Sequence, residues 1–345
     1  MFGKKKIRVA INGFGRIGRA FLKVAREREE IEVVAINDLG NAANLAYLLK
    51  YDSAYGVSPF SVSAKADGKA LIIDGKEVAF IQEKEAPKLP WKALDIDVVV
   101  ESTGLFTDFA KAKVHLEAGA KRVVISAPAK GDPASEAMGA TILMGLNEDR
   151  FKSAQITSNA SCTTNAGSPL MAILDEKIGI EKAILNTVHA YTASQAIVDG
   201  PSKKDLREGR AAAQNIVPSS TGAAIAVTKA LPQLAGKFDG VSIRVPVVVG
   251  SIVDVTFLAK RKTSAEEVNK ILTEAAKEKR WQNIFAVSNE PLVSSDIKGN
   301  PHASIADLEM TRVVDGNLVK VLAWYDNEMG YTHTLVEHVI KAAKA

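Results

Sequence analysis

The chain has 345 residues, of which 47% are hydrophobic and 24% are charged, and its formal net charge is +4. This length suits two domains with apolar cores, and the mild charge does not favour a nucleic acid or an anionic membrane as partner. The single cysteine, Cys162, excludes an intramolecular disulfide and a multi-cysteine metal site, and it suits a reducing cytoplasm. No apolar stretch approaches the roughly 20 residues that a membrane-spanning helix needs. We therefore expect a cytoplasmic protein that holds no metal.

A glycine-rich turn near the N-terminus lies between a predicted strand, residues 7–11, and a predicted helix with one apolar face. The turn has the pattern G-x-G-x-x-G, formed by Gly13, Gly15 and Gly18. A second strand, residues 31–36, is followed by Asp38, 20 residues after Gly18. The motif alone is weak and fits an ordinary strand-to-helix turn, but this whole context is typical of dinucleotide binding. We expect Asp38 to accept hydrogen bonds from the adenosine ribose.

Strands and helices continue to alternate after this unit. Strands are predicted at residues 98–100 and 122–126, and a helix is predicted from Asp108 to Gly119. This alternation favours a mostly parallel sheet with a crevice at the carboxyl ends of its strands, where Ser126 falls. Residues 51–90 contain two Asp-Gly turn signals and are predicted to form inserted hairpins.

Cys162 lies between a predicted strand, residues 155–157, and a predicted helix. At a helix start, unpaired N–H groups stabilise a thiolate, and the small polar neighbours leave the sulfur accessible. The alternative is a buried structural cysteine, which is common for free thiols. His189 ends the strand predicted at residues 182–188, and a lone histidine is more often a bystander. Together, however, the two residues fit the recurrent pairing of an activated thiol with an imidazole.

The second half contains a long polar segment, residues 195–218, which suggests a functional loop or one covered by a partner. Residues 241–245 and 251–258 alternate in part and predict an antiparallel sheet with one solvated face. Arg244 interrupts the first of these strands. It is either paired structurally or faces a cleft where it binds an anion.

A helical pattern covers residues 223–234 and follows a run of hydroxyl side chains. Ser219 or Ser220 is predicted to cap this helix. Thr221 and Gly222 would then present an anion-binding helix start, although simple capping explains the pattern equally well.

These features together favour one chemistry. A nicotinamide cofactor implies hydride transfer, but an aldehyde carbonyl carbon is a poor hydride donor. A thiolate that adds to this carbon creates a tetrahedral centre with a C–H bond to release, and the product is a thioester. A dinucleotide fingerprint with Cys162 and His189 therefore indicates an aldehyde dehydrogenase that works through a thioester.

Five segments also carry a family resemblance: INGFGRIGR at residues 11–19, SNASCTTN at 158–165, HAYT at 189–192, SSTGAA at 219–224 and WYDNE at 324–328. In order and spacing they resemble the phosphorylating glyceraldehyde-3-phosphate dehydrogenases of type I, over essentially the whole chain. The resemblance implies an α/β protein with an N-terminal Rossmann dinucleotide-binding domain. It also implies an α+β catalytic domain with a mostly antiparallel sheet.

The resemblance also implies roles for individual residues. Cys162 is the nucleophile, and His189 lowers its pKa and shuttles the proton. The implied NAD site consists of Gly13, Gly15, Arg16, Ile17, Gly18, Asp38, Lys84, Ser126 and Asn327, where Lys84 stands at a position at which many members have Arg. The implied sites for substrate and inorganic phosphate consist of Ser161, Thr163, Thr192, Thr221, Gly222 and Arg244.

The implied NAD domain covers residues 1–161 and is joined by the C-terminal helix, residues 327–345, while residues 162–326 form the catalytic domain. The resemblance further implies a glycolytic reaction on glyceraldehyde 3-phosphate and inorganic phosphate, in a cytoplasmic homotetramer. The chain departs from the family at Ala166, where a second cysteine is common, and at Glu208, where many bacterial members have a phosphate-site Arg.

Other functions fit parts of this pattern. A relative that oxidises erythrose 4-phosphate would use the same phosphate-binding residues. A non-catalytic NAD-binding regulator would not need Cys162, His189 and Arg244 together, because function follows the site rather than the fold. Redox sensing by Cys162 alone is an alternative that would be a secondary role of the protein.

Overall fold

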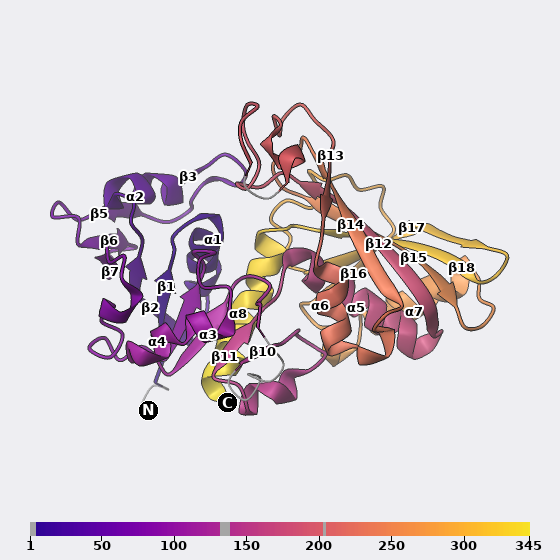
Figure 1. Cartoon of the computed structure of the whole chain (residues 1–345), viewed down its shortest axis with the longest axis horizontal. Helices are drawn as coiled ribbons and strands as arrows, with labels where there is room; N and C mark the ends of the chain where they lie inside the picture. The colour runs from indigo at the N-terminus through magenta and orange to yellow at the C-terminus, as the bar shows by residue number, and fades with distance from the viewer. Residues whose placement is uncertain (1–4, 132–138, 203–204) are drawn as a thin grey trace. The chain divides into compact units, whose positions relative to one another are not determined.

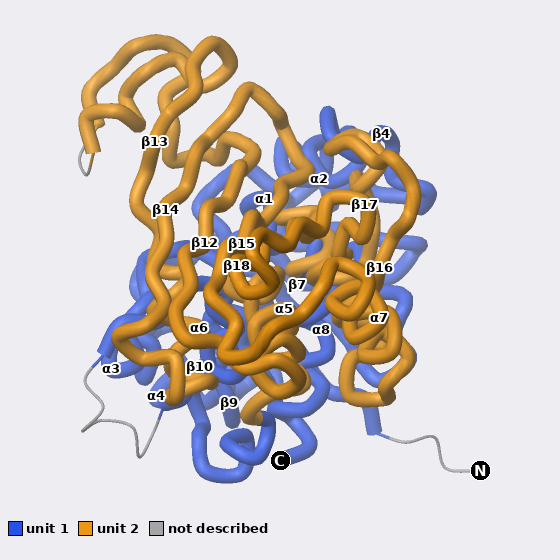
Figure 2. Tube along the Cα trace, turned by 90° about the vertical axis from the view of Figure 1, so that its right-hand side faces the viewer, with its two compact units in different colours: residues 1–142, 148–160, 332–345 blue, residues 143–147, 161–331 orange. Residues whose placement is uncertain are grey.

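A computed structural model describes residues 5–131, 139–202 and 205–345 (Figure 1). The chain divides into two compact units, which Figure 2 shows in blue and orange. The first unit comprises Met1–Ile142, Glu148–Ala160 and Thr332–Ala345, and the second comprises Leu143–Asn147 and Ser161–Tyr331. No helix among the described residues is both long and apolar enough to span a membrane.

The first unit is built on a nine-stranded sheet in the order β10-β11-β9-β8-β1-β2-β7-β6-β5. Its strands are β1 (Ile7–Asn12), β2 (Ile31–Asn37), β5 (Val62–Ala64), β6 (Ala70–Ile73), β7 (Lys76–Ile81), β8 (Val98–Glu101), β9 (Arg122–Ile125), β10 (Gly139–Thr141) and β11 (Ile156–Ser158). From β10 to β7 all neighbours are parallel, and β5 and β6 add an antiparallel edge. A separate small hairpin consists of β3 (Tyr51–Asp52) and β4 (Gly56–Val57).

The helices of the first unit are α1 (Arg16–Ala25), α2 (Ala42–Lys50), α3 (Phe109–Ala112), α4 (Val114–Glu117) and most of α8 (Met329–Lys344). In the sheet, β2 lies on one side of β1 and β8 lies on the other, so the order of the strands reverses at β1. Such a reversal opens a crevice at the carboxyl ends of the strands. The register aligns three of these ends, because Asn12 pairs with both Asn37 and Glu101.

The second unit is built on a seven-stranded sheet in the order β13-β14-β12-β15-β18-β17-β16. Its strands are β12 (Ile180–Ala190), β13 (Val217–Ser220), β14 (Phe238–Val245), β15 (Ser251–Ala259), β16 (Phe285–Ser288), β17 (Ser304–Val314) and β18 (Leu318–Tyr325). Four of its six strand pairs are antiparallel, and the exceptions are β12 with β14 and β16 with β17.

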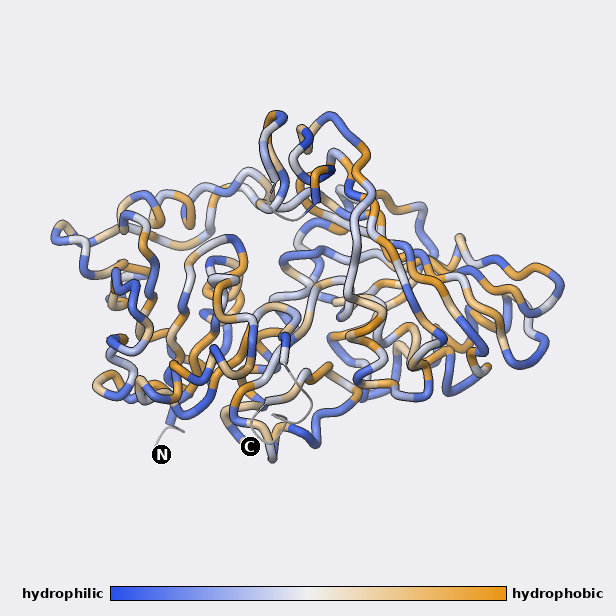
Figure 3. Tube along the Cα trace, viewed as in Figure 1, coloured by the Kyte–Doolittle hydropathy of each residue, from blue (hydrophilic) through white to orange (hydrophobic). Residues whose placement is uncertain are grey.

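One face of this sheet is covered by α5 (Cys162–Lys177), α6 (Ala223–Ala230) and α7 (Ala265–Ala275), as Figure 1 shows. Their apolar side chains form a single core with the sheet strands. Figure 3 shows hydrophobic stretches along these strands and hydrophilic residues concentrated in the turns that join them. Short 3₁₀ helices complete the described chain at Ala86–Lys88, Glu148–Lys152, Leu206–Gly209, Pro232–Leu234 and Lys279–Trp281.

The predicted fold class is confirmed: a parallel α/β unit of dinucleotide-binding type and a mostly antiparallel α+β unit. Three local predictions differ. The helix predicted over residues 223–234 ends at Ala230, and a separate 3₁₀ helix follows at Pro232–Leu234. The helix predicted from Asp108 to Gly119 is interrupted at Lys113 and forms α3 and α4. The cap prediction for α6 is wrong, because Ser219 and Ser220 belong to β13, which pairs with β14.

A buried histidine, His338, joins α8 to β11 of the first sheet. The His338 side chain is fully buried, with Nε2 2.7 Å from the hydroxyl of Thr157 and Nδ1 3.2 Å from the side-chain oxygen of Asn159. Burial, and secondly the charge of Lys341, lower the pKa of His338 to about 3. The folded protein therefore holds this ring neutral.

We predict that His338→Gln makes the protein less sensitive to acid. The unfolded chain binds a proton at this histidine below its ordinary pKa of 6.5, whereas the folded chain does not bind one until about pH 3. The stabilisation is therefore complete above pH 6.5 and is lost as pH falls, by about 1.4 kcal/mol per pH unit. Denaturant unfolding between pH 7.5 and 4.5 should give a shallower slope for His338→Gln, because Gln keeps both hydrogen bonds without titrating. Equal slopes would contradict this assignment.

Candidate functional site

The glycine turn of the first unit leaves an open cradle at the start of α1. Gly13 has φ +94°, and a Cβ there would lie 2.7 Å from the backbone of Ser102 and Thr103, so only glycine fits. A Cβ on Gly18 would lie 2.2 Å from the Gly13 carbonyl oxygen, so the helix packs directly on the turn. Gly15 is the N-cap of α1, and a Cβ built there would have no neighbour within 4 Å. This arrangement fits a pyrophosphate at the helix N-terminus.

The other predicted cofactor residues of the first unit follow the ends of its strands or begin α1. Asp38 accepts hydrogen bonds from the N–H groups of Phe14, at 2.7 Å, and Gly40, at 2.8 Å, so it lies beside the turn. Ser126 donates to the carbonyl of Glu101 at 3.1 Å. Arg16 and Lys84 are exposed, and Ile17 is half-buried in the first turn of α1. Of these residues, Asp38 contacts the glycine turn directly, and Arg16 and Ile17 form the first turn of α1.

Cys162 is the first residue of α5, as the sequence predicts. Ser161 caps the helix by accepting the N–H of Thr164 at 3.0 Å. Ala160, just before the cap, is buried with φ +56°, a left-handed conformation that costs a non-glycine residue energy. This bend separates β11 from α5, so the thiol stands at the helix start.

Two side chains from distant parts of the second unit, His189 and Arg244, form a chain of contacts that begins at this thiol. The sulfur of Cys162 lies 3.4 Å from Nε2 of His189, which ends β12. The register of β12 and β14 pairs His189 with Arg244, whose Nη1 lies 2.6 Å from Nδ1 of His189. The buried Nε of Arg244 has no hydrogen-bond partner among the described residues. A buried, unpartnered guanidinium nitrogen indicates a site for an anion.

Burial dominates the electrostatics of this group. It raises the pKa of the Cys162 thiol, while the Arg244 charge and the Thr163 backbone N–H act in the opposite direction. The net direction differs from the expectation that the helix start favours a thiolate, because desolvation outweighs the helix N–H groups. Burial, and secondly the Arg244 charge, lower the pKa of His189 to about 3. The pair therefore rests as a neutral thiol and a neutral imidazole.

The tautomer of the neutral imidazole is set by two opposed contacts at Nδ1. Nδ1 of His189 lies 2.6 Å from the carbonyl oxygen of Ala190. This oxygen favours the tautomer with the ring proton on Nδ1, whereas Nη1 of Arg244, 2.6 Å from Nδ1, can only donate and favours the tautomer with its proton on Nε2. The lone pair of Nε2 faces the thiol of Cys162 only in the first of these tautomers.

Tyr325 is a site residue to which the sequence analysis gave no role. Its buried hydroxyl lies 2.9 Å from the hydroxyl of Thr163 and 2.8 Å from that of Thr187. Its ring packs edge-on against His189 with centroids 5.9 Å apart. Tyr325 thus joins the first turn of α5 to β12 and supports both catalytic candidates. The signals in the sequence were its place in the segment WYDNE and its position as a polar aromatic residue at the end of an apolar strand.

The remaining predicted residues lie in loops of the second unit. The hydroxyl of Thr192, just after β12, lies 3.1 Å from that of Ser194. Thr221 accepts the N–H of Ala223, and the exposed Gly222 is the N-cap of α6. Asn327 accepts the N–H of Gly250 and the hydroxyl of Ser251, each at 3.1 Å. Among residues 5–131, 139–202 and 205–345, no group of three or more His, Cys, Asp or Glu is placed to hold a metal.

One unit thus presents a dinucleotide cradle, and the other presents a cysteine, a histidine and an arginine with a free buried N–H. These features define an oxidoreductase of the cysteine-dependent, nicotinamide-using class. Two family models match the chain: "Glyceraldehyde 3-phosphate dehydrogenase, NAD binding domain" over residues 7–109 and "Glyceraldehyde 3-phosphate dehydrogenase, C-terminal domain" over residues 161–327.

Curated relatives agree with these models. The glyceraldehyde-3-phosphate dehydrogenase of Mycolicibacterium smegmatis is 47% identical over 347 residues, covering 98% of this chain and 99% of the relative. The Mycobacterium avium enzyme of the same name is 46% identical over 346 residues with the same coverage, and glyceraldehyde-3-phosphate dehydrogenase 1 of Trichoderma koningii is 46% identical over 338 residues, 98% of both chains. The chain belongs to the glyceraldehyde 3-phosphate dehydrogenase family, and its cofactor is NAD.

Proposed function

We propose that this chain catalyses the glycolytic oxidation and phosphorylation of glyceraldehyde 3-phosphate to 1,3-bisphosphoglycerate through a thioester on Cys162. Family membership supports the overall reaction. The observation that supports the covalent route is the distance of 3.4 Å between the Cys162 sulfur and Nε2 of His189, within a site that also contains Arg244.

The first unit would hold NAD at its glycine turn. Gly13, Gly15 and Gly18 leave room for the pyrophosphate at the start of α1, and Asp38 would accept the ribose hydroxyls. The remaining contacts of this proposed site come from Arg16, Ile17, Lys84 and Ser126, and from Asn327, which would orient the nicotinamide amide. NAD supplies the hydride acceptor when bound. The carboxylate of Asp38 would repel the 2′-phosphate of NADP, so NAD is the preferred cofactor.

Cys162 and His189 would perform the covalent steps. The sulfur adds to the aldehyde carbon while His189 Nε2 accepts the thiol proton, which then passes to the new oxyanion to give a thiohemiacetal. Nε2 would then remove the hydroxyl proton as the tetrahedral carbon gives up its hydride, for which bound NAD would supply the acceptor, and a thioester would remain. An oxygen of inorganic phosphate then attacks the thioester carbonyl and expels the sulfur. The product is the acyl phosphate.

Arg244 and Thr192 would bind the phosphate of the substrate. Because the charge of Arg244 lowers the pKa of His189, an anion that neutralises this charge raises that pKa and strengthens the base. Bound substrate would therefore help to activate the histidine that receives the Cys162 proton. The phosphate also holds the aldehyde carbon in line with the sulfur.

Attacking phosphate would bind at the starts of α5 and α6, at Ser161, Thr163, Thr221 and Gly222, where helix N–H groups favour anions. Glu208, which replaces a common arginine, accepts a hydrogen bond from Ser219 at 3.2 Å and does not donate to this site.

We also infer that the enzyme is a cytoplasmic homotetramer, and the long segment after β12 supports an assembly. Large apolar side chains in and just after this segment are exposed, including Ile197 at 88% and Leu206 at 85%. Val198 and Ile216 are exposed as well, and exposed apolar side chains of this size are of the kind that subunits bury.

We predict that Cys162→Ser abolishes NADH formation from glyceraldehyde 3-phosphate and leaves the Kd for NAD within about twofold of the wild-type value, because the hydroxyl is a much weaker nucleophile. Wild-type turnover should require inorganic phosphate. Near wild-type turnover in the variant, measured by absorbance of NADH, would exclude the thioester route.

We predict that Arg244→Ala lowers kcat/KM for glyceraldehyde 3-phosphate by about 10- to 150-fold, because a charge-assisted contact of roughly 1.5–3 kcal/mol is lost. Free glyceraldehyde lacks the phosphate, so its slow turnover should change by no more than about threefold. An equal loss on both aldehydes, with a lower melting temperature, would instead assign Arg244 a structural role.

A further inference from the structure

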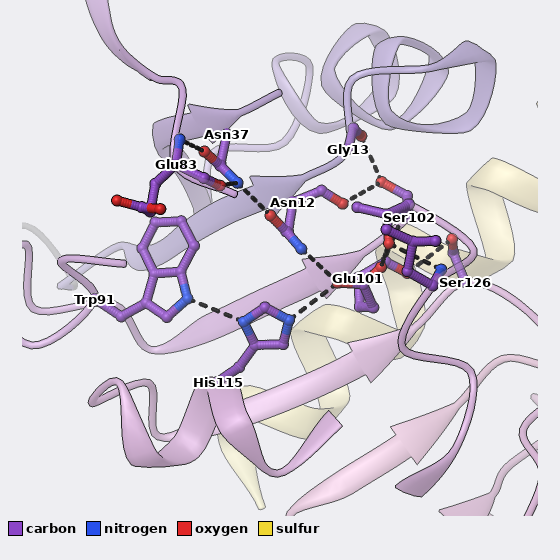
Figure 4. Close-up of polar contacts among 11 residues, drawn as sticks. Asn12, Gly13, Asn37, Glu83, Trp91, Glu101, Ser102, His115 and Ser126 are labelled. Atoms are coloured by element: carbon purple, nitrogen blue, oxygen red, sulfur yellow. Dashed lines mark hydrogen bonds and ion pairs between the residues drawn. The ribbon is translucent and has the colours of Figure 1, made fainter. Parts of the chain in front are cut away.

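A buried carboxylate lies beneath the glycine turn of the first unit, in a chain of polar side chains that the catalytic reaction does not use (Figure 4). Glu101, the last residue of β8, is only 2% exposed. Its Oε2 accepts hydrogen bonds from Nδ2 of Asn12 at 2.6 Å and Nε2 of His115 at 3.0 Å. Its Oε1 accepts the backbone N–H of Thr103 at 2.8 Å and also the hydroxyl of Thr103. Within the described part of the chain, four donors and no acceptor face this group, as an ionised carboxylate requires.

The hydrogen-bond partners also determine the tautomer of His115. The indole N–H of Trp91 can only donate, and it lies 3.2 Å from Nδ1 of His115. Nδ1 is therefore the acceptor, and Nε2 carries the proton that His115 donates to Glu101. Both rings are fully buried, so this donor has no alternative partner in water.

The chain of contacts continues across the strand ends. Nδ2 of Asn37 donates to the side-chain oxygen of Asn12 at 2.8 Å and to the carbonyl of Glu83 at 3.0 Å. The side-chain oxygen of Asn37 accepts the N–H of Glu83 at 2.9 Å. These amides link the carboxyl ends of β1 and β2 and the segment after β7, as Figure 4 shows.

The position of Glu101 gives this network a consequence for the cofactor. Asn12 and Glu101 are register partners across β1 and β8, where the strand order of the sheet reverses. From Asn12 the chain enters the glycine turn, and from Glu101 it enters the loop through Ser102 and Thr103. The hydroxyl of Ser102 also donates to the carbonyl of Gly13 at 2.6 Å. Both loops bordering the crevice are thus held by one carboxylate and its neighbours.

We propose that Glu101 is a positioning residue for NAD, which fixes the glycine turn and the Ser102–Thr103 loop in the geometry that binds the pyrophosphate and the nicotinamide half. Glu101 touches no substrate and acts through the backbone of these loops. This inference rests on the proposed placement of NAD at the glycine turn. It adds a buried network, absent from the predicted site residues, to the determinants of cofactor affinity.

The test is calorimetric titration of wild-type and Glu101→Gln protein with NAD, ADP-ribose and AMP. The Gln amide places N–H groups against at least one of the four donors, so one strand-end contact is lost. We expect the Kd for NAD and ADP-ribose, which extend over the pyrophosphate, to rise about tenfold. The Kd for AMP, which contacts only the adenosine end, should stay within about threefold. The KM for NAD should rise similarly, while kcat changes little.

Trp91→Phe is the matched control. It removes a buried hydrogen bond from the same cluster but leaves all four donors of Glu101 in place. It should lower the melting temperature and leave the Kd for NAD within about twofold. A purely structural role for the cluster predicts instead that both variants weaken NAD binding in proportion to their loss of stability, and this result would overturn the proposal. Failure of the wild-type protein to bind NAD would overturn the placement of NAD itself.

A second pair of variants covers the case in which Glu101→Gln does not fold. His115→Gln retains a donor toward Glu101 and an acceptor toward Trp91, whereas His115→Leu has neither. We expect NAD affinity to be retained within about twofold in His115→Gln and to fall about fivefold in His115→Leu, with unchanged AMP affinity. Equal NAD affinity in the two variants would overturn the proposal.

Discussion

The chemistry that we propose for this protein depends on the contact between the Cys162 sulfur and the imidazole of His189. Neither group reaches the other by local sequence, since 27 residues separate them. The contact exists because α5 begins immediately after a bend at Ala160 and because β12 ends beside that helix start. Burial keeps both groups neutral, which makes the imidazole a proton acceptor rather than a permanent cation. The proposed nucleophile and base therefore lie together without a buried charge pair between them.

Strand register extends this arrangement to the neighbouring groups. Pairing of β12 with β14 places Arg244 beside His189, so one cation contacts the base and also leaves a buried N–H for an anion. Tyr325 connects the same elements from β18. In the first unit, the register of β1 and β8 likewise places Asn12 against Glu101 beneath the glycine turn. Both units use aligned strand ends to bring together residues that are far apart in sequence.

The sequence was sufficient for features that depend on local pattern. The glycine spacing with its flanking strand and helix predicted the cradle, and the polar stretch around Cys162 predicted a helix start. Features set by burial were not accessible, so the raised pKa of the Cys162 thiol differed from the expected effect of the helix N–H groups. Contacts between side chains of different elements were also missed, and Glu101 with Asn12 and His115 is the clearest case. The cap prediction at Ser219 failed because strand pairing with β14 took precedence over local capping.

The most direct test of the covalent route is mass spectrometry of the enzyme after a single turnover. Enzyme, NAD and glyceraldehyde 3-phosphate are mixed without inorganic phosphate, quenched in acid and digested. The account predicts a 3-phosphoglyceroyl adduct on the peptide that contains Cys162, formed in step with NADH and lost when phosphate is added before the quench. NADH formation in the first turnover without an adduct on Cys162, or with the adduct on another residue, would contradict it.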